Sequence, residues 1–207
     1  MNPEGKKTCR FKQEIADMLS ILKTVLCVAA AMFLLNGFVI ANAVIPTSSM
    51  APTIEPGDRV IGIRFLRDYQ RGDIVVFDDP DVEGRYLIKR IIGMPGDHIS
   101  FLDWGDGTCS VSINGEKLEE PYLTEPMFLD PAFADLSLDI PDGCYFCMGD
   151  NRNNSNDARY WERKLITSDE IIARAVFRYW PVGRGGRFIR PSYGSNDFVH
   201  LKNENLS

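Results

Sequence analysis

Residues 25–44, VLCVAAAMFLLNGFVIANAV, decide the architecture of this chain. They contain no charged residue, and the uncharged region extends from Thr24 to Ile54. Twenty helical residues, at about 1.5 Å each, span roughly 30 Å, which is the thickness of the hydrocarbon core of a bilayer. The stretch therefore predicts a transmembrane helix, and we place a single membrane anchor at residues 24–45.

Two other interpretations of this stretch compete with a membrane anchor. A cleaved signal peptide is suggested by Ala41-Asn42-Ala43, which has the A-x-A form of a cleavage site, but apolar regions of signal peptides run to about 7–15 residues and this one is longer. A buried helix of a soluble protein is disfavoured, because a helix that is apolar all round needs a large protein around it. A retained anchor is therefore favoured, and whether the chain cuts itself near Ala43 stays open.

The charges on either side of the anchor predict its orientation. Residues 1–23 hold five basic and three acidic residues, whereas the rest of the chain holds 18 basic and 26 acidic residues. By the positive-inside rule, residues 1–23 form a cytoplasmic N-terminus, and the chain after residue 45 lies outside a cell membrane that it crosses once. The net charge of −6 argues against nucleic acid as a partner, since phosphate binding requires clustered Lys and Arg.

The part beyond the anchor has a mostly β pattern, with short runs of strand-forming residues separated by Gly, Pro and Asp. We treat residues 46–190 as one extracytoplasmic domain, into which the acidic, loop-rich and aromatic residues 101–143 are inserted as a small β subdomain. Residues 191–207 are expected to form a loose polar tail. Asn114-Gly115 predicts a two-residue hairpin turn. The predicted strands are 59–65, 73–77, 85–92, 110–114, a run from 117 onward, 144–148 and 171–179.

The cysteine and histidine content excludes most metal chemistry. Three cysteines lie beyond the anchor, so at least one has no internal partner, and the sequence does not decide whether Cys109 pairs with Cys144 or Cys147. The C-x-x-C spacing at residues 144–147 has neither a second pair nor a histidine cluster beside it, and packed strand cysteines explain it better than zinc. We therefore expect no metal and no cofactor.

Three segments of the outer part have the residue types of a catalytic site. PTSSMAPTI, at residues 46–54, places two serines between prolines, in a rigid turn that can project a hydroxyl. In KRIIGMPGD, at residues 89–97, Lys89 lies between aliphatic neighbours on a strand face, where burial lowers the pKa of an amine toward that of a general base. GDNRNNSNDAR, at residues 149–159, is a polar loop that the pairing of Asp157 with Arg159 can stiffen. Each segment alone has an ordinary explanation: a linker, a surface lysine and a solvated loop.

Together and in this order, the three segments closely resemble the type I signal peptidases, membrane-anchored Ser–Lys endopeptidases that remove signal peptides. The first family motif appears here as Ser49-Met50-Ala51-Pro52-Thr53-Ile54, and residues 89–97 and 149–159 match the other two. The resemblance covers roughly residues 20–185 and implies a signal-peptidase-like β-sheet or barrel as the catalytic domain. Because the motif has Lys89 rather than histidine, it is similar to the bacterial and organellar branch.

The resemblance implies a role for each matching position. Ser49 would be the nucleophile, and Lys89 would be the general base that takes its proton and returns it to the leaving amine. Thr47 and the backbone N–H of Ser49 would supply the oxyanion hole. The supporting positions would be Ser155, which orients the lysine, and the ion pair of Asp157 with Arg159.

Two positions depart from the commonest family pattern. Ser48 stands where glycine is usual, so two adjacent hydroxyls precede Met50, and chemistry alone does not exclude Ser48 as the nucleophile. Ala158 stands where serine is common, which removes one hydroxyl from the loop.

The implied substrates are secreted preproteins with small residues at the −1 and −3 positions, bound as an extended strand and cleaved through an acyl-enzyme. We assign the substrate pocket to the residues that flank the catalytic pair: Met50, Ile54, Leu87 and Ile88. Membrane lipid and a nearby protein translocation machinery are the other expected partners. Four apolar residues are expected to be exposed near the site and to contact lipid: Phe65, Leu66, Trp104 and Phe133.

Several other functions compete with signal-peptide cleavage. A self-cleaving repressor peptidase also uses Ser and Lys, but predicts a DNA-binding domain and no anchor. A specialised peptidase of the same family, with one dedicated substrate, stays open. An inactive membrane-anchored peptide-binding module or a structural cell-surface domain leaves the Ser49 and Lys89 pair unexplained. The sequence does not say which preproteins are cut, whether paralogues exist or what the oligomeric state is.

Overall fold

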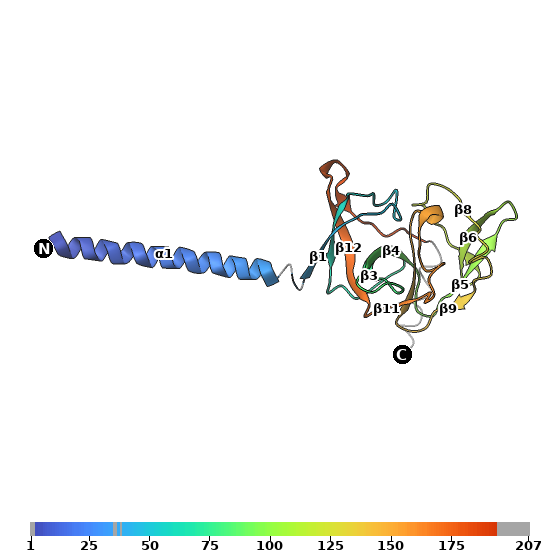
Figure 1. The fold of residues 1–207 in the computed structure, drawn as a ribbon, viewed down its shortest axis with the longest axis horizontal. Helices are drawn as coiled ribbons and strands as arrows, with labels where there is room; N and C mark the ends of the chain where they lie inside the picture. Colours follow the sequence, from blue (N-terminus) through green and yellow to red (C-terminus); the bar gives the residue numbers. More distant parts are fainter. Residues whose placement is uncertain (1–2, 35–36, 38, 194–207) are drawn as a thin grey trace. The chain divides into compact units, whose positions relative to one another are not determined.

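The structure, a computed structural model, describes residues 3–34, 37 and 39–193, and the chain divides into two compact units, residues 1–40 and 41–207 (Figure 1). The first unit contains helix α1, Pro3–Leu34. Its residues 16–33 form an 18-residue segment that is long and apolar enough to cross a membrane, and none of that segment is buried. Large apolar side chains such as Phe33, which is 76% exposed, lie on its surface, which is compatible with a membrane-spanning helix.

Strand β1, Ile40–Val44, corrects one boundary of the sequence analysis. We placed these residues in the anchor, but the described helix ends at Leu34 and residues 40–44 join a β-sheet. Hydropathy alone does not separate an apolar strand from the end of an apolar helix. The β-branched residues of this run and the glycine before it favour a strand.

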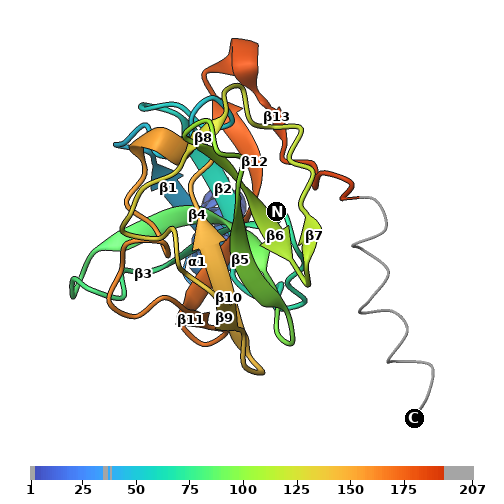
Figure 2. The same cartoon turned by 90° about the vertical axis from the view of Figure 1, so that its right-hand side faces the viewer.

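The second unit is mostly β, as predicted, and contains two antiparallel sheets. The main sheet has the order β1-β2-β12-β3-β4-β10-β11, with β13 beside β12, and is an open path among the described residues. The small sheet has the order β7-β6-β5-β9, with β8 beside β6, and lies at the end of the domain far from β1 (Figures 1 and 2). The strands of the main sheet after β1 are β2 Arg59–Ile63, β3 Ile74–Asp78, β4 Tyr86–Gly93, β10 Cys144–Met148, β11 Ile166–Thr167, β12 Ile171–Trp180 and β13 Gly186–Arg187. The strands of the small sheet are β5 His98–Asp103, β6 Thr108–Ile113, β7 Glu116–Lys117, β8 Met127–Phe128 and β9 Leu138–Asp139.

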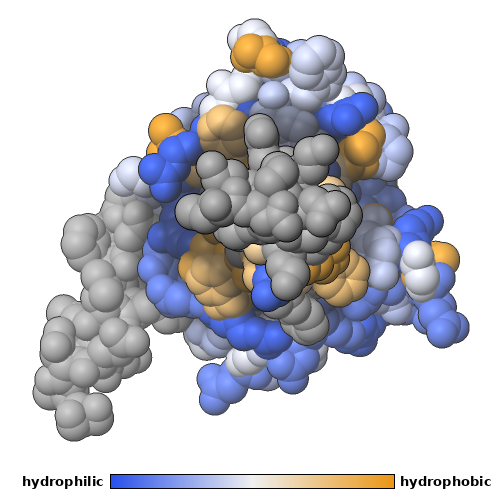
Figure 3. All heavy atoms as spheres, turned by 90° about the vertical axis from the view of Figure 1, so that its left-hand side faces the viewer, coloured by the Kyte–Doolittle hydropathy of each residue, from blue (hydrophilic) through white to orange (hydrophobic). Residues whose placement is uncertain are grey.

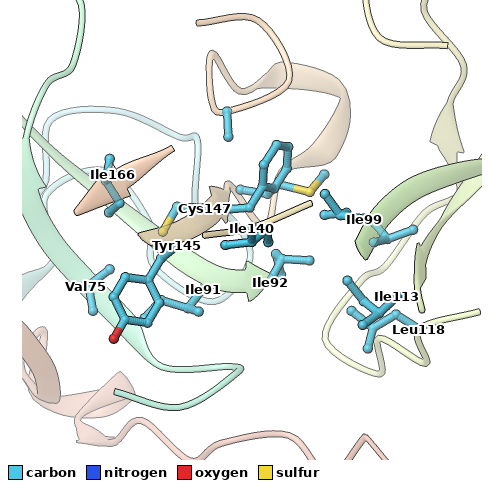
Figure 4. Packing of buried hydrophobic residues seen from close by; sticks show 14 of the residues in the cluster. Val75, Ile91, Ile92, Ile99, Ile113, Leu118, Ile140, Tyr145, Cys147 and Ile166 are labelled. Carbon is cyan, nitrogen blue, oxygen red and sulfur yellow. The ribbon is translucent and has the colours of Figure 1, made fainter. Parts of the chain in front are cut away.

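The two sheets share one hydrophobic core. Figure 4 shows Ile92 of β4 on the side of Ile99, Ile113 and Leu118 of the small-sheet region, whereas Ile91 lies toward Tyr145. Ile91, Ile92 and the three small-sheet residues belong to one core cluster, and all five are at most 2% exposed. The small sheet begins at β5, three residues before the insertion that we expected from residue 101. It is therefore packed onto the main sheet rather than built around a core of its own.

The turn predicted at Asn114-Gly115 joins β6 to β7, with both residues at positive φ, 56° and 85°. This is the backbone that a two-residue hairpin requires. Cys109, Cys144 and Cys147 are free thiols, so the described part of the second unit holds no disulfide.

The expected loose tail from residue 191 begins as packed structure. Tyr193 is 2% exposed, and Arg190, the residue before the start of the tail, forms an ion pair with Asp73 at 2.6 Å. From residue 194 onward the tail lies outside the described residues.

Candidate active site

Ser49 lies in a tight turn that follows β1. The Ala51 N–H donates to the Ser48 carbonyl at 3.0 Å, and the Ile54 N–H donates to the Met50 carbonyl at 2.9 Å. Met50 and Ile54 are fully buried and hold the turn in a core cluster with strands β2, β3, β4 and β12. Packing on both sides of Ser49 therefore fixes its backbone, and the residue is only 8% exposed.

Lys89 reaches Ser49 from the middle of β4. Its Nζ is 2.6 Å from Ser49 Oγ, and the lysine is 2% exposed. Lys89 forms no ion pair with any described residue, and burial lowers its pKa from 10.5 to about 8, although the charge of Asp157 acts in the opposite direction. A buried amine that is easily deprotonated, in direct contact with a hydroxyl, has the arrangement of a base and its nucleophile.

The two adjacent serines have different partners. Ser48 Oγ accepts a hydrogen bond from Asn154 Nδ2 at 3.3 Å, and the Ser48 carbonyl accepts one from Asn151 Nδ2 at 3.1 Å. Ser49 Oγ contacts Lys89 and lies 3.5 Å from Thr47 Oγ1. The geometry thus favours Ser49 over Ser48 as the hydroxyl that a base can activate.

The loop at residues 149–159 packs directly against the backbone of Ser49. The Asn151 N–H donates to the Ser49 carbonyl at 3.0 Å. A Cβ added to Gly149 would lie 2.4 Å from that carbonyl oxygen and 2.3 Å from Ser155 Oγ, so only glycine fits here. Ser155 itself is 9% exposed, and its hydroxyl has no hydrogen-bond partner of ordinary geometry among the described residues. Its predicted contact with Lys89 stays a prediction.

Asp157 and Arg159 form the ion pair that the sequence suggested. Arg159 Nε and Nη2 bind the two oxygens of Asp157 at 2.8 and 2.9 Å, and Asp157 Oδ2 also accepts the Gly149 N–H at 3.0 Å. Burial raises the pKa of Asp157, but the hydrogen bonds and charge of Arg159 outweigh this and hold the pKa below its usual value. The carboxylate therefore stays ionised and holds the start of the loop.

Arg90 and Asp150 form a second buried ion pair, which was not predicted from the motifs that contain these residues. Arg90 Nε and Nη2 bind Asp150 at 2.8 and 2.6 Å, and Arg90 Nη1 donates to the Gly72 carbonyl at 2.8 Å. Because Arg90 follows Lys89 and Asp150 follows Gly149, this pair links the segment of Lys89 to the loop beside Ser49. The sequence feature that could have revealed this ion pair is the presence of an arginine and an aspartate in the two motifs that also contain the other site residues.

The four residues assigned to the substrate pocket do not lie together. Met50, Ile54 and Ile88 belong to one core cluster, whereas Leu87 packs against the other core cluster. Alternation along β4 separates Leu87 from Ile88. Met50 and Ile54 also have no exposed surface through which a peptide would contact them.

Of the four residues expected to contact lipid, only some are exposed. Phe65 and Trp104 are 62% and 55% exposed, and Leu66 is partly buried. Phe133 is 1% exposed, with its ring 5.1 Å from the Arg159 guanidinium, so the prediction of an exposed Phe133 was wrong. Figure 3 shows apolar groups, in orange, at separate places on the face that it draws.

A second serine lies in a Ser–His–Asp series on the small sheet. His98 Nδ1 is 2.6 Å from Asp139 Oδ1, and His98 Nε2 is 3.0 Å from Ser137 Oγ. Asp139 and Ser137 are exposed, on or just before β9, and none of the three residues is buried. These open side chains lack the burial that distinguishes Ser49 and Lys89, and they provide a control for the assignment of the nucleophile.

Comparisons with known proteins agree on one family. The model of the family described as signal peptidase, peptidase S26, matches residues 18–180. A probable signal peptidase I-2 of Synechocystis sp. is 36% identical over 176 residues, which cover 81% of this chain and 76% of that protein. A probable signal peptidase I-1 of the same organism is 35% identical, covering 90% and 91%. Signal peptidase I U of Bacillus subtilis is 31% identical, covering 86% and 95%.

Proposed function

Because the chain belongs to the signal peptidase family, peptidase S26, we propose that it cleaves signal peptides from preproteins with Ser49 as nucleophile and Lys89 as general base. The contact of 2.6 Å between Lys89 Nζ and Ser49 Oγ carries this assignment. The enzyme is a serine endopeptidase, and its apolar α1 is compatible with a membrane anchor.

The reaction begins with neutral Lys89. Its Nζ takes the proton of Ser49 Oγ, which attacks the carbonyl carbon of the scissile bond. The resulting oxyanion accepts hydrogen bonds from the Ser49 N–H and from the Thr47 hydroxyl. Lys89 then gives its proton to the leaving amine, and the acyl-enzyme remains.

Deacylation uses the same base a second time. Lys89 takes a proton from water, which attacks the acyl carbon, and the proton returns to Ser49 Oγ as the acyl bond breaks. The burial that lowers the pKa of Lys89 to about 8 supports this role, because a lysine with an ordinary pKa would be protonated at neutral pH. The ion pairs of Asp157 with Arg159 and of Asp150 with Arg90 hold the loop beside Ser49.

The substrate is proposed to bind as an extended strand, with small side chains at −1 and −3. The N-terminus is proposed to lie in the cytoplasm and residues 46–190 outside, in contact with membrane lipid and near the translocation machinery. In sealed cells, Cys9 should then resist a membrane-impermeant maleimide and react only after lysis. Labelling of Cys9 in sealed cells would reverse the orientation.

Cleavage of a preprotein whose signal ends in Ala-x-Ala, by the full chain in detergent, tests the catalytic pair. Ser49→Ala and Lys89→Ala should each lower kcat by about 10³-fold or more. Ser48→Ala and the control Ser137→Ala should keep activity within a few-fold of the wild type. Activity that survives in Ser49→Ala, or disappears in Ser137→Ala, would contradict the Ser–Lys assignment.

A further inference from the structure

The segment EEPYL, residues 119–123, lies after β7 of the small sheet and contacts the arginines of both catalytic motifs. This EEPYL segment belongs to the acidic and aromatic insertion, which none of the assignments above uses. Its Glu120 side chain is only 5% exposed, although glutamate is usually a surface residue. A carboxylate buried in this insertion, close to the catalytic loop, needs a partner that compensates its charge.

The partner of Glu120 is Arg152 of the catalytic loop. Arg152 Nη1 and Nη2 bind the two oxygens of Glu120 at 2.6 and 2.5 Å, and the Arg152 side chain is 1% exposed. The Tyr122 hydroxyl donates to Glu120 Oε1 at 2.5 Å, and burial raises the pKa of Tyr122 well above its ordinary value, so the hydroxyl keeps its proton. A planar two-point contact of this kind fixes the orientation of the guanidinium as well as its position.

Arg152 passes this constraint to the turn that contacts Ser49. Its Nε donates to the Gly149 carbonyl at 3.0 Å. Gly149 in turn packs against the Ser49 carbonyl, which accepts the Asn151 N–H at 3.0 Å. Glu120 is thus linked to the backbone of Ser49 through Arg152 and a single turn of the loop.

Tyr122 contacts the second motif through Arg90. The Arg90 guanidinium lies 4.1 Å from the centre of the Tyr122 ring, a distance at which a cation and an aromatic face attract. Arg90 holds Asp150, the residue between Gly149 and Asn151, through two hydrogen bonds. The EEPYL segment therefore constrains the turn at residues 149–151 through two arginines, Arg152 and Arg90.

We propose that Glu120 and Tyr122 are positioning residues for signal-peptide cleavage, holding the turn at residues 149–151 against Ser49. The proposal rests on the proposed function of Ser49. It assigns to the small sheet the task of bracing the catalytic loop. Neither residue contacts Ser49 or Lys89 in the described structure, so both act through the arginines.

Loss of this brace should affect the rate more than substrate affinity. Glu120→Gln keeps the shape of the side chain but replaces one accepting oxygen with an N–H₂ group, which faces a guanidinium donor. Arg152 is then free to leave the Gly149 carbonyl, and the turn can shift from Ser49. Since small misplacements of catalytic groups cost up to about 100-fold in rate, we expect kcat to fall by roughly 10- to 100-fold with KM changed less than about threefold.

The test compares Glu120→Gln with Glu119→Gln in the full chain. Glu119 is the adjacent acid, its side chain is 71% exposed, and its surface ion pair with Lys117 at 3.1 Å should matter little. Both variants are assayed for preprotein cleavage at a temperature well below their measured Tm, so that loss of folded protein does not enter kcat. The expected result is a reduced kcat for Glu120→Gln and wild-type kinetics for Glu119→Gln.

A kcat of Glu120→Gln equal to that of the wild type would overturn the inference, even if Tm fell. If Glu120→Gln does not fold, Tyr122→Phe decides, because it keeps the ring over Arg90 and removes only the hydroxyl, which donates to Glu120 and accepts from Arg152 Nη2 at 3.3 Å. A smaller but clear loss of kcat, about three- to tenfold, is expected there, and unchanged kcat would overturn the inference. Absence of cleavage by the wild type would count against the proposed function itself, separately from the brace.

Discussion

Replacing Lys89 by methionine should abolish cleavage and stabilise the fold at neutral pH. Burial lowers the pKa of Lys89 from 10.5 to about 8, a difference of about 2.5. At about 1.4 kcal/mol for each pKa unit, keeping the buried amine protonated costs roughly 3 kcal/mol of the free energy of unfolding. Methionine lacks this cost but loses the hydrogen bond to Ser49, about 1 kcal/mol, so the net gain at pH 7 is about 2 kcal/mol.

The sign of this difference should change with pH. Between pH 8 and 10.5 the unfolded chain still binds the lysine proton while the folded protein has released it, so the wild type gains stability as pH rises. Near pH 10.5 the cost has disappeared, and Lys89→Met should then be less stable than the wild type by about 1 kcal/mol.

Urea unfolding of the full chain in mild detergent, followed by tryptophan fluorescence, measures this change. Trp161 is 1% exposed and packs against Phe77, so it reports the core. Lys117→Met is the matched control, since Lys117 is 45% exposed and its substitution should have the same small effect at pH 7 and pH 10.5. A stability difference between Lys89→Met and the wild type that stays constant from pH 7 to 10.5 would refute the reasoning.

Three further predictions concern the same site. The value of kcat/KM for preprotein cleavage should rise with pH and level off above about 8, because Lys89 acts as a base only when neutral; a decline from pH 7 to 8 would contradict this role. Gly149→Ala should lower kcat by at least about tenfold, because its Cβ would lie 2.4 Å from the carbonyl oxygen of the proposed nucleophile. Gly186→Ala is the control: its Cβ would have no atom within 4 Å, so this variant should match the wild type in steady-state kinetics. Asp157→Asn should lower the free energy of unfolding, measured in urea, by about 3–5 kcal/mol, because it leaves the buried Arg159 without its carboxylate. Asp169→Asn is the control and should leave this free energy unchanged, because the Asp169 side chain is 93% exposed.

Much of the main sheet could be predicted from residue patterns. Strand β10 has the predicted bounds, and β2, β3, β4 and β12 differ from the predicted strands by at most two residues at either end. These strands are long enough, and rich enough in β-branched and aromatic residues, to give a clear pattern. Strands β8, β9 and β11 have two residues each and carry no periodicity, so no local pattern reveals them.

The proposed catalytic pair and the residues that hold it were predicted in a different way from the strands. The burial of Lys89 follows from its aliphatic neighbours, but its contact with Ser49, 40 residues away, was expected only because the motifs resemble a family. The contact between Glu120 and Arg152 spans 32 residues and joins an insertion to a motif. Neither composition nor spacing pairs such residues, because many acids and bases are available and only the packed fold selects among them.

Strand β1 limits the positions at which the chain can be cleaved or truncated without exposing the edge of the main sheet. Ala41-Asn42-Ala43, the segment with the form of a cleavage site, lies within β1 at the edge of the main sheet, and Asn42 accepts a hydrogen bond from the Tyr179 hydroxyl at 2.9 Å. Cleavage after Ala43 would remove most of this strand and leave the backbone of β2 as an open edge, which is a template for aggregation. A soluble form made by removing α1 should therefore begin no later than residue 40, and a form that begins after Ala43 should precipitate.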